Sequence, residues 1–566
     1  MNLRSALPFV ICTALIIAFF ALFFRNAVNV PNGDDLYCLL LFTQEFQDAK
    51  TFAERLHLLI DQWVEHRIVY SRFTALISYW LTGQVNFVVI ALIGNLTLVG
   101  FTVLFWKLIK KTGVSLYYLI PVVFTLFSPV TYEGNLWAGA STVYMPVGFL
   151  GLLTVYLIVY SNSNKSSLIL PLLAALLATY SFGNGMFAFA AGLAVLIYQR
   201  MFRTAAVWGL TGIVAIILYF RDFEAHSSTK AFSISNHFQE PLYLVYNMLA
   251  FVGGILDYTE NSNAPLVAAN IPALLLGLCL LVAVCGGCYL FLIKKSTEDP
   301  ASKKLKVAWL GMAAFILITS LAMAYSRTLG GVMTTLSSRY KIYSMVFWIL
   351  AYCGCLIHFR KKRLVGLSFG MASLLMLLFN YYTSYDKLSN YKSYLLSGLF
   401  NYNKNGHWVI YRNTSYYEGA SKILSDSISR NSKPVYAFKP VFPQLTLEAI
   451  QNAPMMEHVK ISAKGECNRP NDKCISIHTD EYPSPSNHFG GIYLVVYNES
   501  NMFLFVVDPV KNGRVNMLRT GDYFKKGVFM YSNLGSTLTP GSRYQLAVFC
   551  PTEKQQIRRI AFNLEG

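Results

Sequence analysis

Long apolar segments constrain the fold of this chain more than any other feature of its sequence. Many of them run for about 18 residues or more with almost no charge, which is the length that a helix needs to cross the core of a bilayer. Hydrophobic residues make up 54% of the chain and charged residues 13%, and the mean hydropathy is +0.43. A soluble enzyme of this length is far more polar. The composition therefore predicts a polytopic α-helical membrane protein.

Clusters of lysine and arginine between the apolar segments predict how the spans are oriented. The net charge is +18, but these cations lie in short loops, where positive charge sets topology rather than binding nucleic acid. With the clusters in the cytoplasm, we expect eleven spans, a cytoplasmic N-terminus and interfacial helices at 68–81 and 242–256. The first span lacks a clear small-x-small cleavage site, so we expect it to stay uncleaved. The expected spans are 7–25, 86–106, 114–130, 146–161, 167–183, 186–199, 204–221, 265–293, 306–325, 341–358 and 364–382.

After Tyr382 the sequence becomes polar and aromatic, and alternating runs at 491–497 and 502–507 predict strands. We therefore expect a membrane domain over 1–385 and a β-rich or α+β domain over 386–566, which the odd number of spans places outside the cytoplasm. Cys467 and Cys474 close a short polar loop there and are expected to form a disulfide. Metal binding is the rival interpretation, but no nearby Cys-x-x-Cys or His pair completes four ligands.

Two adjacent carboxylates, Asp34 and Asp35, follow the first span. Ionisable groups beside a bilayer are costly, which makes this pair the first candidate for chemistry. The preceding Gly33 gives the turn freedom to aim either side chain. The alternative role is structural, because aspartate is a favoured N-cap and a helix is expected to begin at Leu36. Binding of a divalent metal to the pair also stays open, although no complete set of hard oxygen ligands is visible.

Further polar and aromatic residues fall on the same expected side of the membrane as the aspartates. Arginines clamp phosphate through paired hydrogen bonds, aromatic rings stack on sugars, and a carboxylate deprotonates a hydroxyl. An outward cavity that combines these groups is suited to a sugar phosphate. The alternatives are arginines that reach lipid head groups and aromatic rings that form an interfacial belt. The candidates are Arg67, Arg72, Arg327, Arg339, Tyr132, Glu133, Trp137, Tyr144 and Tyr340.

These residues resemble the GT-C superfamily of integral-membrane glycosyltransferases, and specifically the bacterial O-antigen glucosyltransferases of the serotype-converting type. The resemblance covers roughly residues 1–385. One departure is His66, which stands where the family pattern has glycine; a solvated or hydrogen-bonded histidine is the simplest role for it. The motifs are the acidic pair at 34–35, the aromatic-then-arginine element at 63–67, the Trp-x-Gly loop at 137–139, and the Ser-Arg-Tyr turn at 338–340 with Arg327 before it.

The resemblance implies a hexosyltransferase of the bacterial inner membrane that acts at its outer face. It implies a polyprenyl phosphate carrying a hexose, with glucose expected, as the donor, and a lipid-linked or surface polysaccharide such as O-antigen as the acceptor. Asp34 or, slightly favoured, Asp35 is the implied base. The implied phosphate ligands are Arg327 and Arg339, with Arg67 and Arg72 able to bind phosphate or acceptor. Glu133 and the aromatic candidates are the implied contacts to sugar or acceptor.

Two other activities use similar substrates. A flippase or permease for a lipid-linked sugar would account for the broken apolar stretch at 180–185, which is typical of discontinuous transporter helices. Against it, the polar residues concentrate on one face rather than at mid-membrane, and no inverted repeat is visible. A polysaccharide polymerase or ligase more naturally carries its bulk in an internal external loop than in a C-terminal tail. A transferase is therefore the preferred hypothesis.

Overall fold

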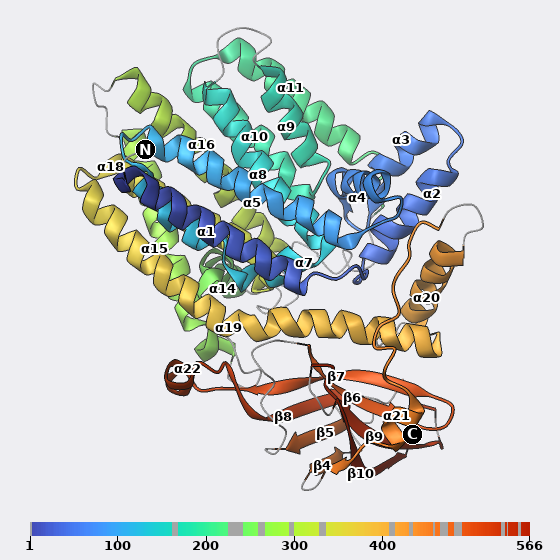
Figure 1. The fold of residues 1–566 in the computed structure, drawn as a ribbon. Helices are drawn as coiled ribbons and strands as arrows, with labels where there is room; N and C mark the ends of the chain where they lie inside the picture. The colour runs from blue at the N-terminus through green and yellow to red at the C-terminus, as the bar shows by residue number, and fades with distance from the viewer. Residues whose placement is uncertain are drawn as a thin grey trace. The chain divides into compact units, whose positions relative to one another are not determined.

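The computed structural model divides the chain into two compact units (Figure 1). The first contains Met1–Arg25, Phe42–Thr82 and Val88–Tyr385, and the second contains Asn26–Leu41, Gly83–Phe87 and Asp386–Gly566. The second unit therefore includes the aspartate pair as well as the C-terminal part of the chain. The residues that the structure describes are 3–160, 168–224, 241–258, 266–293, 299–327, 335–406, 414–429, 434–456, 459–464, 474–479, 490–533, 538–539, 541–552 and 556–565.

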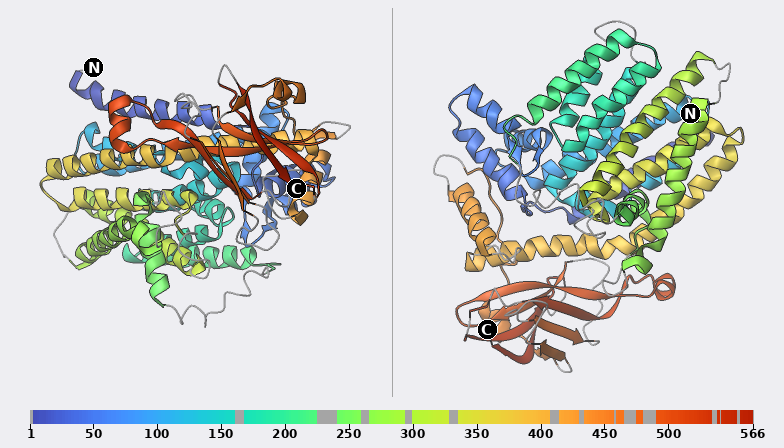
Figure 2. Two further views of the ribbon diagram at one scale, coloured as in Figure 1. Left: turned by 90° about the horizontal axis from the view of Figure 1, so that it is seen from below. Right: turned by 180° about the vertical axis from the view of Figure 1, so that it is seen from behind.

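The first unit is built almost entirely from helices, which both views of Figure 2 show packed side by side. Its long elements are α1 (Leu3–Asn26), α4 (Val69–Thr82), α5 (Phe87–Lys110), α8 (Ala138–Tyr160), α9 (Ile169–Thr179), α10 (Phe187–Tyr198), α11 (Phe202–Tyr219), α14 (Pro241–Gly253), α15 (Leu266–Ile293), α16 (Pro300–Arg327), α18 (Lys341–His358) and the first part of α19 (Lys362–Asn405). Its short elements are α2 (Phe42–Asp48), α3 (Phe52–Ile60), β1 (Gln62–Trp63), β2 (His66–Arg67), η2 (Leu116–Leu119), α6 (Ile120–Leu126), η3 (Pro129–Thr131), α7 (Tyr132–Leu136), η5 (Gly183–Met186), η6 (Gly254–Leu256) and η8 (Ser338–Tyr340).

Eight helices of the described chain are long and apolar enough to cross a membrane, in agreement with the expected polytopic helical class. They coincide with eight of the expected spans. The other three, 114–130, 167–183 and 186–199, contain shorter helices: α6 has 7 residues, α9 has 11 and α10 has 12. At 1.5 Å per residue α6 is about 10 Å long, which is far less than the ~30 Å of a hydrocarbon core. The number of crossings and their orientation stay predictions.

Trp309 shows how small residues let the helices of the first unit approach each other. This side chain on α16 is fully buried, and its indole N–H donates to the carbonyl of Leu350 on α18 at 2.8 Å. A Cβ on Gly287 of α15 would lie 2.8 Å from the indole ring, and one on Gly354 of α18 would lie 2.9 Å from it. The two glycines therefore make the space that the ring fills, as small residues commonly do between membrane helices.

We expect Gly287→Ala to lower the unfolding temperature, because the added methyl group would overlap the Trp309 ring. Overpacking of this kind costs about 1–3 kcal/mol. Gly286→Ala is the matched control, since a Cβ at Gly286 meets no atom within 4 Å and alanine is the better helix former. Thermal unfolding of both variants in detergent measures the difference. Equal unfolding temperatures would contradict the packing argument.

The second unit is a sheet with helices. Its helices, besides the rest of α19, are η1 (Leu36–Leu41), α20 (Thr414–Ser429), α21 (Leu447–Gln451) and α22 (Arg514–Thr520). Its strands are β3 (Met455–Met456), β4 (Lys460–Lys464), β5 (Cys474–Thr479), β6 (Ile492–Tyr497), β7 (Met502–Lys511), β8 (Phe524–Asn533), β9 (Arg543–Phe549) and β10 (Ile557–Glu565). They form one sheet in the order β3-β10-β9-β6-β7-β8-β5-β4, in which only β3 and β10 are parallel.

The expected strands at 491–497 and 502–507 are β6 and β7, so this prediction is confirmed. They pair from Ile492 with Val507 to Tyr497 with Met502, and all six residues of β6 are buried because the strand is central and both of its faces are covered. The side chain of Asn401 on α19 bonds to both the N–H and the carbonyl of Leu504, at 2.7 and 2.9 Å. This pair of bonds fixes α19 to β7.

The expected disulfide lies outside the described residues. Cys467 is not among them, and of Cys474 only the backbone, at the start of β5, is described. The pairing stays a prediction.

Candidate functional site

Five candidate side chains lie together in the first unit: the expected phosphate ligands Arg327 and Arg339, and Trp137, Tyr144 and Tyr340, which are expected to contact sugar or acceptor. We call them the arginine–aromatic cluster. Arg327 is the last residue of α16, and Arg339 and Tyr340 lie in η8, directly before α18. Trp137 separates α7 from α8, and Tyr144 lies in the second turn of α8. The cluster is therefore assembled where several helices of the bundle begin or end.

The rings of the cluster surround both guanidinium groups. The guanidinium carbon of Arg339 lies 5.2 Å from the centre of the Tyr340 ring and 5.3 Å from that of Trp137. The guanidinium carbon of Arg327 lies 5.7 Å from the Tyr340 ring centre, so both cations approach the same ring. Tyr144 meets Tyr340 edge to face, with 5.0 Å between ring centres. Cation–π contacts of this kind stabilise a charge that has lost part of its hydration.

Both arginines of the cluster retain a buried donor. The Nε atoms of Arg327 and Arg339 are buried and have no hydrogen-bond partner among the described residues. An unmatched buried donor costs about 1–3 kcal/mol and more when it is charged, so such groups in native proteins call for an explanation. A bound oxyanion supplies one, because guanidinium groups match the geometry of phosphate oxygens.

Glu133 holds the turn that carries Arg339. Its Oε2 accepts hydrogen bonds from the hydroxyls of Ser337 and Ser338, at 2.7 and 3.1 Å, and from the backbone N–H of Arg339 at 3.4 Å. The backbone N–H of Glu133 in turn donates to the Ser338 hydroxyl at 3.0 Å. The carboxylate thus satisfies donors at the start of η8, where negative charge is favoured. These bonds give Glu133 a positioning role, and its expected contact with sugar or acceptor stays a prediction.

A buried ion pair fixes the same turn from the other side. Lys341 Nζ lies 3.0 Å from Asp257 Oδ2, and both side chains are only 7% exposed. Lys341 is the first residue of α18, and Asp257 directly follows η6. Breaking such a pair leaves an uncompensated buried charge, which is strongly destabilising. The start of α18 is therefore anchored to the segment that follows α14.

His66 lies against the aromatic side of the cluster. Its ring centre is 3.8 Å from that of Phe182, which meets Tyr144 edge to face at 5.2 Å. A Cβ on Gly183 would lie 3.2 Å from His66 Nδ1, so the glycine admits the imidazole. Burial, followed by the charge of Arg327, lowers the pKa of His66 to about 4. The imidazole is therefore neutral at physiological pH, and its buried Nδ1 has no partner among the described residues.

Arg67 makes hydrogen bonds to the backbone rather than facing the cluster. Its Nε donates to the carbonyl of Tyr219 at 2.7 Å, Nη2 donates to that of Arg221 at 2.6 Å, and Nη1 donates to that of Ile60 at 2.5 Å. These three bonds join β2 to the end of α11 and to the last residue of α3. They give Arg67 a structural role, and its expected role as a phosphate ligand stays a prediction.

Arg72 on α4 has a similar environment. Its Nη1 donates to the carbonyl of Asp61 at 2.6 Å, and its guanidinium carbon lies 5.2 Å from the centre of the Phe42 ring. The side chain is 5% exposed. Arg72 thus packs against the helices around it, with Nη1 on backbone carbonyls where Arg67 places all three nitrogens there. Its expected role as a phosphate ligand stays a prediction.

The aspartate pair forms the entry to η1 in the second unit. Gly33 has φ +54°, which permits the turn, and the Asp34 carbonyl accepts hydrogen bonds from the N–H groups of Tyr37 and Cys38. The Asp35 carboxylate accepts from the N–H of Asn32 at 3.0 Å and is 1% exposed. Asp34 is exposed. The Asp35 side chain thus bonds to an N–H three residues before it, as the carboxylate at position N3 of a capping box does, and not to a following N–H as an N-cap does.

The sequence missed two residues at this site. Phe182 lies in the broken stretch at 180–185, where an aromatic residue beside two glycines could have marked it as a candidate. Lys341 directly follows the Ser-Arg-Tyr motif.

Of the remaining candidates, Tyr132 is half-buried at the first position of α7. Within the described parts of the chain, no group of three or more His, Cys, Asp or Glu side chains is arranged to hold a metal ion.

In comparisons with known proteins, no protein-family model, curated protein or solved structure matches the chain.

We expect acid to destabilise the protein through His66. The pKa of this side chain is about 4 in the folded protein and ~6.5 in an unfolded chain. Between these values the unfolded state binds a proton that the folded state does not, so stability falls as the pH drops from about 6.5 to 4. His66→Gln should flatten this part of a plot of unfolding temperature against pH, whereas replacing the exposed His57 by Gln should not. Parallel curves for wild type and His66→Gln would show that the histidine is not held neutral.

Proposed function

We propose that the protein is an integral-membrane glycosyltransferase. It transfers a hexose, glucose by resemblance, from a polyprenyl phosphate to a lipid-linked or surface polysaccharide such as O-antigen, at the outer face of the bacterial inner membrane. The observation that carries this proposal is the arginine–aromatic cluster, because it combines two partly buried cations, unmatched donors and ring faces. In a sugar phosphate, the phosphate is matched by the cations and the donors, and the sugar is matched by the ring faces.

In this proposal Arg327 and Arg339 bind the phosphate of the donor. Their Nε atoms lack partners among the described residues, and their charge stabilises the negative charge that grows on the leaving phosphate. Trp137 and Tyr144 offer ring faces to the sugar. The neutral His66 adds one nitrogen for a hydroxyl of the sugar. Arg67 and Arg72 are left out of this assignment because of their bonds to backbone carbonyls.

The transfer step needs a base for the acceptor. An acceptor hydroxyl gives its proton to a carboxylate and attacks the anomeric carbon, the bond from that carbon to the phosphate oxygen breaks, and the polyprenyl phosphate leaves with the electron pair. The acidic pair supplies the carboxylate by resemblance. We assign the base to Asp34, because it is exposed whereas Asp35 is 1% exposed and accepts a backbone N–H.

We expect Asp34→Asn to reduce transfer at least about 100-fold, since a general base contributes ~10²–10⁴ in rate. Asp35→Asn should keep much of the activity, because the amide oxygen still accepts the Asn32 N–H. The assay is transfer of labelled sugar from a synthetic polyprenyl-phosphate donor to purified lipid-linked polysaccharide in proteoliposomes. Asp222→Asn is the control, since this carboxylate is 88% exposed beside Arg221.

Full transfer by the Asp34→Asn variant would remove Asp34 as the base. Loss of transfer in Asp35→Asn alone would return the assignment to Asp35. If wild type transfers nothing and labelled donor crosses the bilayer instead, the protein is a flippase.

A second experiment tests the phosphate ligands. Arg339→Lys keeps the positive charge but loses Nε and the planar fork that matches phosphate. We expect kcat/KM for the lipid-phosphate donor to fall about 10- to 100-fold, mostly through KM. Arg221→Lys is the control because its side chain is 74% exposed. Unchanged kcat/KM in Arg339→Lys would contradict the role of the cluster.

A further inference from the structure

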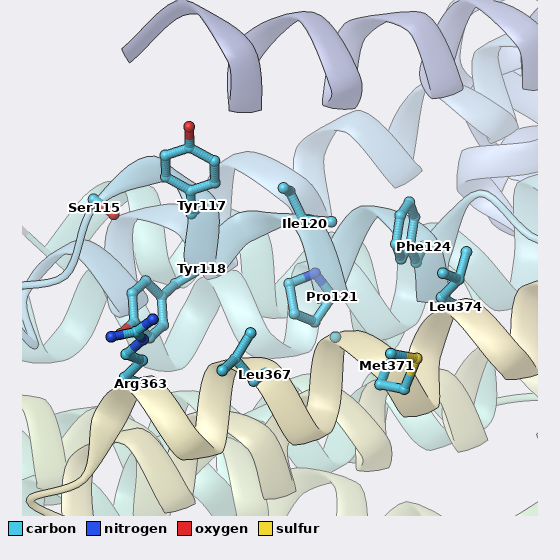
Figure 3. A pocket seen from close by; sticks show the side chains of 12 residues that line it. Ser115, Tyr117, Tyr118, Ile120, Pro121, Phe124, Arg363, Leu367, Met371 and Leu374 are labelled. Atoms are coloured by element: carbon cyan, nitrogen blue, oxygen red, sulfur yellow. The ribbon is translucent and has the colours of Figure 1, made fainter. Parts of the chain in front are cut away.

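A cavity of about 500 Å³ lies at the other end of α18, between the η2–α6 segment and the first turns of α19. Figure 3 shows the side chains that line it. Arg339 precedes α18 and Arg363 follows it, so the cavity is separated from the arginine–aromatic cluster by the length of that helix, about 27 Å. Its volume is within the range of small-molecule sites. The proposed transfer reaction does not use it.

The cavity is polar at one end and apolar at the other. Ser115, Tyr118 and Arg363 lie at one end, and Phe124 and Leu374 lie at the opposite end (Figure 3). Leu374 lies eleven positions after Arg363 in α19, which corresponds to ~16 Å along the helix. This is about half of a ~30 Å hydrocarbon core, the depth of one leaflet. The cavity therefore has the polarity and the length of a lipid with its head group at Arg363.

The cavity opens to the outside of the helix bundle. Leu367 and Met371, which line it, are 63% and 61% exposed. Gly370 of α19 borders this open space, since a Cβ there would meet only Pro121, at 3.8 Å. A molecule from the surrounding bilayer can thus enter sideways, without passing through the protein.

The two segments that line the cavity carry only positive charges. Residues 86–132 and 341–385 contain no Asp or Glu. Arg360, Lys361 and Arg363 are exposed at the start of α19 or just before it, and Lys110 and Lys111 are exposed at the end of α5. Lys362 Nζ donates to the carbonyl of Thr112, which joins these two basic segments. A negatively charged head group is the complement of such a surface.

We propose that this cavity binds an acidic phospholipid, with its phosphate at Arg363 and one acyl chain along Leu367, Met371 and Leu374. The proposal does not depend on the transferase activity. By the distribution of basic residues, this end faces the cytoplasm, where anionic lipids attract basic segments.

Native mass spectrometry of the full chain in detergent, titrated with dioleoyl phosphatidylglycerol or dioleoyl phosphatidylcholine, tests this site. We expect phosphatidylglycerol to bind at least fivefold tighter. Arg363→Gln should weaken its binding about fivefold, the effect of one cation near a lipid head group. Gly370→Leu should weaken it while all charges remain, because the new side chain fills the cavity. Lys361→Gln is the control, since Lys361 is exposed on the same basic segment but does not line the cavity.

Three results would overturn the proposal. Equal binding of the two lipids would remove the role of charge. Equal losses in Arg363→Gln and Lys361→Gln would mean that the basic surface attracts lipid without a site. Competition by glycerophosphoglycerol, which has the head group but no acyl chains, as strong as that of the whole lipid would mean that the apolar part of the cavity contributes nothing. Because Arg363→Gln changes an exposed side chain, its result does not depend on whether Gly370→Leu folds.

Discussion

The carboxylate of Glu133 is the contact on which the arginine–aromatic cluster depends. It joins α7 to η8 across 204 residues of sequence, through the hydroxyl of Ser337 and the donors that follow it. Gly134 packs directly against this turn, since a Cβ there would lie 3.6 Å from the Cα of Arg339. A turn held in this way presents Arg339 from a fixed backbone position. The Lys341–Asp257 pair holds the next residues, so the cation is positioned before any ligand arrives.

Fixed cations at the edge of an apolar bundle are costly, and the aromatic rings offset part of that cost. Each arginine loses water when it packs beside Tyr340, and the ring faces replace some of the lost hydration. The remaining unmatched Nε donors strengthen the attraction for an anion, because hydrogen bonds and charges act more strongly where water is excluded. The same feature that costs stability therefore favours binding of a phosphate. The cost of these unmatched donors, together with the attraction that they give for an anion, favours a site for a charged group of the substrate over a purely structural cluster.

Sequence reasoning succeeded where one residue type has one dominant physical role. Apolar length predicted the helices, alternation predicted β6 and β7, and the order of motifs grouped Arg327 and Arg339 with aromatic residues. It could not find interactions with partners distant in sequence. The sequence makes Arg67 a candidate phosphate ligand, and the structure adds its bonds to the carbonyls of Tyr219 and Arg221. The sequence makes Glu133 a candidate contact to sugar or acceptor, and the structure adds the hydroxyls of Ser337 and Ser338 that donate to its carboxylate. The placement of the aspartate pair in the second unit was likewise outside the reach of local pattern.

The two anion sites that we infer differ in how they hold their cation, and this difference fits their roles. Arg339 is enclosed by rings and placed on a turn that Glu133 and Lys341 anchor, as a reacting phosphate requires, because small displacements at a reaction centre cost large factors in rate. Arg363 lies exposed at the start of α19 beside an open apolar cavity. A bilayer lipid exchanges continually and needs no fixed geometry, so an exposed cation and an apolar cavity are sufficient for it. In this proposal, the length of α18 separates a site of fixed geometry from one that needs none.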